Sequence, residues 1–282
     1  MTERYDALKT AFKYFKRRVP PPDLSSLLVP SRLEGAPVDC AASPSTTELH
    51  SLRLCPLSRW RRRGFEGRPG LLHVSGVFNG ADAQKFWAER LLRLCGPPNQ
   101  TNVGDAPSSE LEVVDESRLA RLRWATFGYH YDWVKKEYRA DFRSPLPEDV
   151  GRLSELICRA IGFGDFRAEA AILNAYGRKS TLSGHVDNLE WRLDRPLLSL
   201  SFAQSGVYLS GGQTRDEQPL PMLLAPGDVL VLSQEQRTTY HAVPRVVFDT
   251  HYEPADDGDD DDWLTRFMNT HRLNLTVRQL TH

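Results

Sequence analysis

The second half of the chain, from residue 168 onward, consists of short apolar segments separated by turns. Each segment is four to eight residues long, which is typical of β-strands. In order they read AAILNAY, LLSLSF, GVYLSG, MLLA, DVLVLS, HAVPRVVF and LNLTVRQL. Many short strands at close spacing indicate a β-sandwich or barrel, because such strands bury one face against a second sheet. This half of the chain therefore predicts a double-sheet jelly roll.

Helical patterns come before most of the strands. Residues 3–18, 82–94 and 147–161 repeat apolar side chains every three or four positions. Two strand patterns, at residues 71–78 and 123–131, lie among them. We therefore expect an α+β fold in which a jelly-roll core is buttressed by N-terminal helices. The first helix has a basic polar face, which leaves open a helix docked on the core, a nucleic-acid arm and a mitochondrial presequence; its acids argue against the presequence.

The tripeptide His185-Val186-Asp187 follows the first strand of this half. Residues two apart in an extended segment point to the same side, so His185 and Asp187 can face one ion. Together with a distant histidine, such a pair forms the 2-His-1-carboxylate triad of non-haem Fe(II) oxygenases. Tripeptides of this kind are common by chance and mostly belong to surface loops, so the pair needs support from the rest of the chain.

A third ligand should be a histidine on another strand. His241 lies 54 residues after Asp187, with a turn before it and an apolar strand after it. The other histidines fit less well, because they precede the pair, border the acidic segment or fall at the end of a helical pattern: His50, His73, His130, His251 and His271. His241 is therefore the candidate.

The last strand pattern has one polar face. Alternation places Arg272, Asn274, Thr276 and Arg278 on the same side. This face predicts either a polar cavity or a solvent-exposed surface. An oxygenase that uses a keto acid needs a fixed cation for its far carboxylate, and the guanidinium fork of arginine binds a carboxylate through two hydrogen bonds. Asn174 and Tyr176 also alternate, one strand before the metal pair, and can reach the same cavity.

Charge is distributed unevenly along the chain. Seven acids lie between Glu253 and Asp262, and since the whole chain has a formal net charge of −1, the remainder stands at +6 without them. We interpret this acidic stretch as a solvated insertion. Residues 53–68 are basic and contain Arg59, Arg61, Arg62 and Arg63 around Trp60. Such a run suits phosphate contacts or a solvated loop, and the sequence leaves both open.

The cysteine pattern bears on the compartment. Four cysteines show no paired spacing, and a chain of 282 residues needs no disulfide to fold, so we expect reduced thiols in an intracellular compartment. No secretory signal or membrane-spanning run is visible. We expect a monomer without membrane contact, in the nucleus, cytoplasm or mitochondrion.

The order N-x-Y, H-x-D, a distant H and R-x-N-x-T-x-R resembles the signature of the AlkB family of Fe(II)/2-oxoglutarate dioxygenases. The surrounding sequence is most similar to the branch of the first animal AlkB homologue. The resemblance covers most of the chain, and the combined motif is far more specific than any part of it. It is carried by RWATFGYHYDW, GFGDFRAEAAILNAYGRKSTLSGHVD, LLSLSFAQSGVYLSGGQTRDEQP, PGDVLVLS, YHAVPRV and RLNLTVRQL.

The resemblance implies a role for each motif residue. It assigns Fe(II) to His185, Asp187 and His241, and the far carboxylate of 2-oxoglutarate to Arg272. It makes Asn174, Tyr176 and Asn274 hydrogen-bonding partners of the cosubstrate, and Arg278 a second arginine near the metal carboxylate. O2 is the third reactant. The acidic stretch at 256–262 has no counterpart in the family's pattern.

The implied substrate is a methylated base in nucleic acid, either 1-methyladenine in tRNA or N6-methyladenine in single-stranded or unpaired DNA. Oxidation of 5-methylcytosine in tRNA, oxidation of a protein side chain and binding without catalysis remain alternatives. Tyr129, Tyr131 and Trp133 are candidates for stacking on a flipped base, although Trp133 fits core packing equally well. We divide the chain into an N-terminal helix and linker (1–52), a nucleotide-recognition lid with supporting helices (53–165) and the jelly-roll core (166–282), which form one compact unit.

Overall fold

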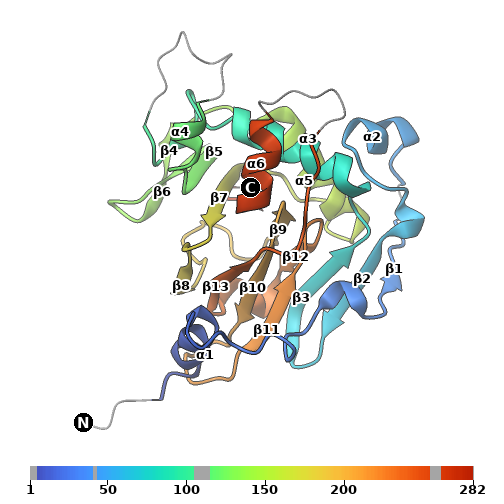
Figure 1. The fold of residues 1–282 in the computed structure, drawn as a ribbon. Helices are drawn as coiled ribbons and strands as arrows, with labels where there is room; N and C mark the ends of the chain where they lie inside the picture. The colour runs from blue at the N-terminus through green and yellow to red at the C-terminus, as the bar shows by residue number, and fades with distance from the viewer. Residues whose placement is uncertain (1–4, 41–42, 105–114, 255–261, 282) are drawn as a thin grey trace.

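The computed structural model describes residues 5–40, 43–104, 115–254 and 262–281. In these residues the chain forms two antiparallel sheets with helices packed around them (Figure 1). Most of the acidic stretch, residues 255–261, lies outside the described part. The expected combination of helices and antiparallel strands is therefore confirmed.

The larger sheet has ten strands in the described residues. Its order is β1-β2-β3-β12-β9-β14-β7-β5-β4, and β6 pairs with β5 off this path. The strands are β1 (Ala36–Pro37), β2 (Arg61–Phe65), β3 (Arg68–Ser75), β4 (Gln100–Thr101), β5 (Trp124–Asp132), β6 (Glu137–Arg143), β7 (Ala170–Gly177), β9 (Leu197–Phe202), β12 (Val229–Leu232) and β14 (His271–Arg278). Strands from both halves of the chain thus share one sheet.

The smaller sheet runs in the order β11-β10-β13-β8. Its strands are β8 (Leu182–His185), β10 (Ser205–Ser210), β11 (Leu220–Leu224) and β13 (His241–Val247). The helices are α1 (Ala7–Lys16), α2 (Thr46–Ser51), α3 (Gly80–Arg93), α4 (Glu116–Leu119), α5 (Glu148–Ala160) and α6 (Trp263–Thr270), with short 3-10 turns η1 (Pro30–Arg32), η2 (Leu57–Arg59) and η3 (Gln234–Thr238). The three long helical patterns in the sequence correspond to α1, α3 and α5.

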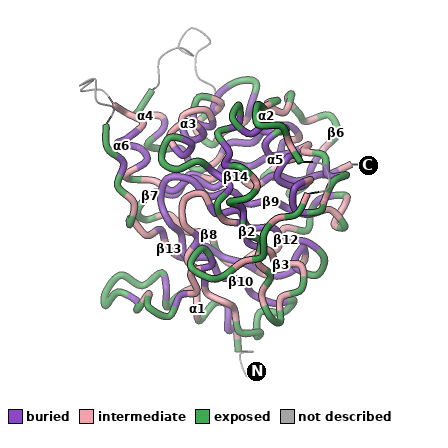
Figure 2. Tube along the Cα trace, turned by 90° about the vertical axis from the view of Figure 1, so that its right-hand side faces the viewer, coloured by how far each residue is buried: buried purple, intermediate pink, exposed green. Residues whose placement is uncertain are grey.

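The two faces of β14 explain how the layers assemble. Leu273, Leu275 and Val277 join the main core, which also contains the buried faces of α3, α5 and α6. The alternate residues of β14 point to the other side of the sheet, because successive side chains of a strand face opposite ways. On that side a second cluster, including Leu230 and Val243, packs between the two sheets. Figure 2 shows buried residues concentrated along the strands and exposed ones on the connecting loops.

Helix α1 covers the outer face of the smaller sheet. Leu8 and Phe15 pack against Val207 and Leu209 of β10. Asp6 caps the helix by accepting from the backbone N–H of Lys9 at 2.7 Å. These contacts show that α1 is docked on the core, which is one of the three roles considered for this helix.

The expectation that helices come first and strands later is wrong in part. Strands β2 and β3 form a hairpin, and β3 pairs with β12 of the jelly-roll half, while β5 pairs with β7. The second half of the basic segment, residues 61–68, belongs to this hairpin, and the first half is loop with the short turn η2. The charge pattern hid β2 because its side chains are exposed or half-buried, so the strand needs no alternation of apolar residues.

Within the described residues, none of the helices has the length and apolar character that crossing a membrane requires.

Candidate metal and cosubstrate site

A cavity of about 390 Å³ lies between the two sheets. The larger sheet contributes side chains from β7 and β14, and the smaller sheet contributes β8 and β13. The wall includes Ile172, Asn174, Tyr176, His185, Asp187, His241, Arg272, Asn274, Thr276 and Arg278. The structure therefore brings together every residue that the sequence motifs selected for the metal and the cosubstrate.

His185, Asp187 and His241 offer three ligand atoms that all lie within 4.8 Å of one another. Pairing of β13 with β8 sets His241 directly opposite His185. Asp187 follows two residues after the end of β8, and its carboxylate lies 3.6 Å from His185 Nε2 and 3.9 Å from His241 Nε2. These separations exceed hydrogen-bonding distance and leave room for an ion among the three groups. Two imidazoles and one carboxylate suit Fe(II).

Hydrogen bonds orient both imidazoles for metal binding. His185 Nδ1 lies 2.9 Å from the backbone oxygen of Ser183, and His241 Nδ1 lies 3.4 Å from that of Thr239. A carbonyl oxygen only accepts, so Nδ1 carries the proton and Nε2 presents its lone pair, as in metal-binding histidines generally. Burial, reinforced by the charge of His185, lowers the pKa of His241 to about 4, which keeps this ring neutral at pH 7.

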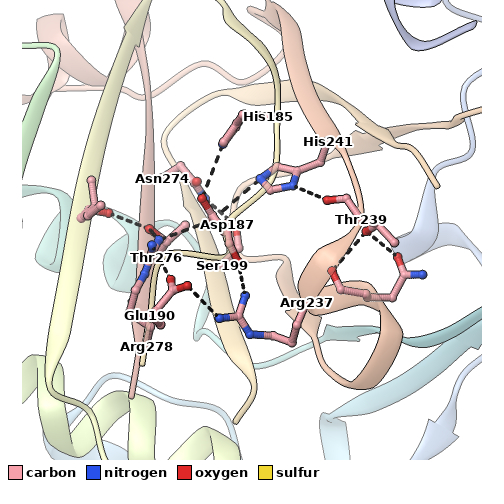
Figure 3. Close-up of polar contacts among 12 residues, drawn as sticks. His185, Asp187, Glu190, Ser199, Arg237, Thr239, His241, Asn274, Thr276 and Arg278 are labelled. Atoms are coloured by element: carbon pink, nitrogen blue, oxygen red, sulfur yellow. Dashed lines mark hydrogen bonds and ion pairs between the residues drawn. The ribbon is translucent and has the colours of Figure 1, made fainter. Parts of the chain in front are cut away.

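A buried ion network holds Asp187. Arg278 Nη2 lies 3.4 Å from Asp187 Oδ2, and Arg278 Nη1 donates to Glu190 at 2.8 Å (Figure 3). Arg237 forms an ion pair with Glu190 at 3.2 Å, not aligned as a hydrogen bond, and donates to the backbone oxygen of Asp187 at 3.0 Å. Burial alone would raise the pKa of Asp187, but Arg278 and the two histidines outweigh it and hold that pKa well below its usual range.

Arg272 presents a buried cation to the cavity. It is 2% exposed, and its Nη2 donates to Ser201 Oγ at 2.9 Å. Its Nε and Nη1 have no hydrogen-bond partner in the described part of the chain. A Cβ on Gly206 would lie 2.6 Å from Arg272 Nε, so the glycine leaves space for the guanidinium. A buried guanidinium with two unsatisfied donors is costly unless an anion completes it, and a carboxylate of a bound keto acid fits that need.

The polar residues around Arg272 fit the same ligand. Asn274 Nδ2 donates to Ser199 Oγ at 2.8 Å and to the Leu200 backbone oxygen at 3.0 Å, which fixes its amide against β9. Tyr176 is buried, and burial raises its pKa to about 12, so its hydroxyl remains a neutral donor. Asn174 lines the cavity on the neighbouring strand.

The three aromatic candidates separate into two places. Tyr131 and Trp133 line the cavity, with their ring centroids 4.7 Å apart. Trp133 is 46% exposed, so it is not a core residue. Tyr129 lies outside this cavity and lines a second hollow with Arg143.

The arginine cluster does not approach the cavity. Arg59 ends η2, and Arg61, Arg62 and Arg63 belong to β2, near the opposite edge of the larger sheet from β5. Trp60 is fully buried and donates to the backbone oxygen of Cys55 at 3.0 Å. The interpretation of Trp60 as an aromatic interleaved for base contacts is therefore wrong, because its ring is part of the core.

Sequence reasoning missed Glu190, Arg237 and Tyr138. Tyr138 and Glu190 both contact Arg278, and Arg237 reaches Glu190 from η3. Glu190 lies three residues after Asp187, and that short spacing was the one signal available. Nothing in the local sequence of Arg237 distinguishes it from a surface arginine.

Comparison with known proteins agrees with this geometry. A profile of the 2OG-Fe(II) oxygenase superfamily matches residues 70–278. The human protein named nucleic acid dioxygenase ALKBH1 is 37% identical, over 85% of this chain and 71% of its own length. The tRNA demethylase abh1 of Schizosaccharomyces pombe is 37% identical, over 77% of this chain and 80% of its own.

Among solved structures, OsALKBH1 matches with a TM-score of 0.51 at 20% identity, covering 77% of this chain and 99% of that one, which is a likeness of fold. The profile match extends over most of the chain, and the similarity to the human relative covers 85% of it. The chain therefore belongs to the 2OG-Fe(II) oxygenase superfamily and is an AlkB-type dioxygenase that uses Fe(II), 2-oxoglutarate and O2.

Proposed function

We propose that this dioxygenase demethylates bases in nucleic acid, with 1-methyladenine in tRNA or N6-methyladenine in unpaired DNA as its substrate. The observation that carries the proposal is a metal triad inside a cavity whose wall includes Tyr131 and Trp133. An aromatic wall suits a planar base taken out of its stack. The names of the two relatives, a nucleic acid dioxygenase and a tRNA demethylase, support the same class of substrate.

Each residue of the site then has a proposed role. His185, Asp187 and His241 hold Fe(II), and Arg272 binds the far carboxylate of 2-oxoglutarate, assisted by Asn174, Tyr176 and Asn274. When bound, Fe(II), 2-oxoglutarate and O2 would supply the oxidising chemistry: hydroxylation of the methyl group, with succinate and CO2 as products of the cosubstrate and formaldehyde as the product of the lost methyl group. Arg278 keeps Asp187 ionised and correctly oriented. Tyr131 and Trp133 hold the base, and the enclosed cavity limits the access of water.

The architecture supports a double-stranded β-helix. The two facing antiparallel sheets, with the metal ligands on the inner face of the smaller one, have the layering of that fold. We also keep the division into an N-terminal helix and linker, a lid segment and a jelly-roll core. We assign the nucleotide-recognition lid to β5 and β6, because residues of both strands line the cavity.

The arginine cluster is proposed to hold phosphates of a large substrate. Arg59, Arg61 and Arg62 are exposed, which leaves them available to a backbone. Six inter-strand steps separate β2 from β5 in the sheet order, on the order of 30 Å. Only a folded or long nucleic acid spans that distance, which favours tRNA over a short single strand.

We infer an intracellular setting and a monomeric enzyme. Cys55, Cys95 and Cys158 are buried free thiols, which suits a reducing compartment such as the nucleus, the cytoplasm or the mitochondrial matrix. A single chain supplies all three ligand residues and Arg272, so the site needs no second copy.

The test is a mass-spectrometric screen of modified tRNA and single-stranded DNA with Fe(II) and 2-oxoglutarate. We expect loss of a base methyl group with one succinate formed for each. Hydroxymethylcytosine or formylcytosine as the product would shift the assignment to oxidation of 5-methylcytosine. If a protein substrate stimulated succinate formation and no nucleic acid did, the reaction would be oxidation of a protein side chain. A salt-dependent affinity for nucleic acid would instead favour demethylation of a base.

A further inference from the structure

A second hollow of about 480 Å³ is lined by Gly128 and Tyr129 in the middle of β5, by residues 143–146 at and after the end of β6, and by Glu169. Tyr129 lines this hollow and Tyr131 lines the main cavity. The two tyrosines are two residues apart on β5, and both pack against one small cluster that contains Tyr138 and Leu280. Both rings therefore lie on the side of β5 that faces this cluster, about 7 Å apart along the strand, and each lines one of the two spaces.

Trp191 lines neither space, but its exposed ring packs on Tyr129, which belongs to the wall of the hollow. Its centroid lies 5.7 Å from that of Tyr129, edge to face, with an interplanar angle of 78°. The indole is 50% exposed, and Trp191 directly follows Glu190, which lines the main cavity. An aromatic side chain that packs on one edge and is otherwise open offers a free face for stacking.

Arg143 contributes a positive charge to the wall of the hollow. Its guanidinium lies 5.4 Å from the centre of the Tyr129 ring, and its Nη1 donates to the Tyr129 hydroxyl at 3.1 Å. Arg143 is exposed, and in the described part of the chain no carboxylate forms an ion pair with it. Glu169 also lines the hollow, but its oxygens already accept from the N–H groups of Leu280 and Thr281 and from the Thr281 hydroxyl. These hydrogen bonds hold the Glu169 carboxylate toward Leu280 and Thr281 but leave its charge in place. The described wall therefore carries one cation, Arg143, that can meet a phosphate, and one carboxylate that already has three donors.

We propose that this hollow is a second nucleotide subsite, which takes the neighbour of the methylated nucleotide in a single strand. The base of the neighbour stacks on Trp191, and a phosphate of the linking backbone meets Arg143. The inference rests on the proposed function and narrows its substrate class: a methylated base within an unpaired strand is bound in preference to a free methylated nucleoside.

The chemistry of the hollow favours a nucleotide over other occupants. An open aromatic face accepts any base, because every base has a π-face, and an unpaired guanidinium accepts a phosphate. An apolar peptide would leave Arg143 without a counter-charge, and an acidic peptide would leave Trp191 without a planar group to cover it.

The test measures how much affinity a neighbouring nucleotide adds. Calorimetric titrations use the enzyme with Fe(II) and 2-oxoglutarate without O2. The probes are the 5′-monophosphate of 1-methyladenosine and a trinucleotide with the same base at its centre. For the wild type we expect the trinucleotide to bind about 5- to 150-fold more tightly, which is the range of one base–aromatic stack. Trp191→Ala should lose most of this gain, and Trp191→Phe should retain it.

Trp263→Ala is the matched control. Trp263 is a half-buried ring at the start of α6 with Arg93 over it at 5.8 Å, whereas Trp191 packs on Tyr129 of the hollow's wall. The affinity gain of this variant should equal that of the wild type. Arg143→Ala should reduce the gain and also its dependence on salt concentration.

Two results overturn the subsite: a wild-type gain below twofold, or a gain that survives in Trp191→Ala. Failure of the proposed function is a separate outcome, in which no methylated base is demethylated in the mass-spectrometric screen. In that case the same titrations with an unmodified mononucleotide and trinucleotide still decide whether Trp191 and Arg143 bind a neighbouring nucleotide.

Discussion

The guanidinium of Arg278 lies 3.4 Å from the carboxylate of Asp187, and the same group donates to Glu190 at 2.8 Å. Arg278 is 5% exposed and Glu190 6% exposed, so the interaction is screened little by solvent. Arg278, at the end of β14, thus bridges the candidate metal ligand Asp187 and Glu190, an acid that is not part of the sequence motif.

Arg278→Ala is expected to destabilise the metal-free protein by about 3–5 kcal/mol, because it leaves the Asp187 carboxylate without its ion-pair partner and Glu190 with Arg237 alone. Urea unfolding in the presence of a chelator measures this. Arg192→Ala, which breaks an exposed pair with Asp194, is the control and should cost about 0–1 kcal/mol. Equal losses in the two variants would mean that the buried network does not contribute to stability.

His185→Ala or Asp187→Ala is expected to abolish iron binding and succinate formation while the fold remains. Three ligands cover one face of the ion, and the triad has no spare member. Iron content, succinate yield and circular dichroism are the measurements. His251→Ala, a change at an exposed histidine, should leave all three unchanged. Full activity in either ligand variant would remove the triad from the mechanism.

Arg272→Ala should weaken 2-oxoglutarate binding by about 10- to 150-fold, since a charge-assisted pair contributes about 1.5–3 kcal/mol. Nucleic-acid affinity should change little, because Arg272 lies deep between the sheets and far from the basic hairpin. Titration of each ligand separately measures the two effects. If the affinity for 2-oxoglutarate were unchanged, Arg278 and not Arg272 would be assigned as the partner of its far carboxylate.

The double variant Arg61→Ala and Arg62→Ala should flatten the plot of log affinity against log salt for tRNA by about 1.4–1.8 units if both side chains contact phosphate. A short single strand should show no change, because it cannot span the sheet from β5 to β2. Binding isotherms at several salt concentrations provide the slopes. If the double variant and the wild type gave the same slope for tRNA, the arginines of the hairpin would be solvated side chains that do not contact phosphate.

Stability should fall as the pH drops below about 6.5, partly through His130. This histidine is 2% exposed, and burial lowers its pKa below the ordinary 6.5. Below pH 6.5 the unfolded chain therefore binds a proton that the folded chain does not, so this contribution is complete above pH 6.5 and is lost as the pH falls toward the folded pKa.

His130→Gln should reduce the slope of unfolding free energy against pH by up to about 1.4 kcal/mol per pH unit in that window. Urea unfolding of the metal-free protein between pH 5 and pH 7.5 gives the slope. His251→Gln should have no such effect. A slope that is the same in His130→Gln and the wild type would contradict the assignment.

Local alternation was sufficient to predict the inner face of the site. His185 with Asp187, and Arg272 with Arg278, share a side because their spacing is even and the backbone is extended. The neighbouring network was not predictable in this way. Glu190 and Arg237 come from separate turns, and an isolated charged residue in a turn normally faces solvent.

Strand order was the other feature that the sequence could not provide. Patterns show where strands begin and end, but pairing partners depend on how the whole sheet closes. The basic hairpin and β5 were assigned to one lid segment, and the sheet order sets them near opposite edges. Trp60 was misread for a related reason, because a tryptophan among arginines has the same local sequence whether its ring faces water or the core.

The position of β14 has a consequence for synthesis of the chain. It lies between β7 and β9, and Thr276 pairs with Ile172 on one side and with Ser199 on the other. Both neighbours leave the ribosome well before β14, so each exposes an unpaired edge while the intervening residues are translated. The nascent chain therefore passes through a stage in which the larger sheet is split in two and Arg272 is still to come. The larger sheet is completed only when β14 enters between β7 and β9, so Arg272 and Arg278 are the last residues of the site to arrive.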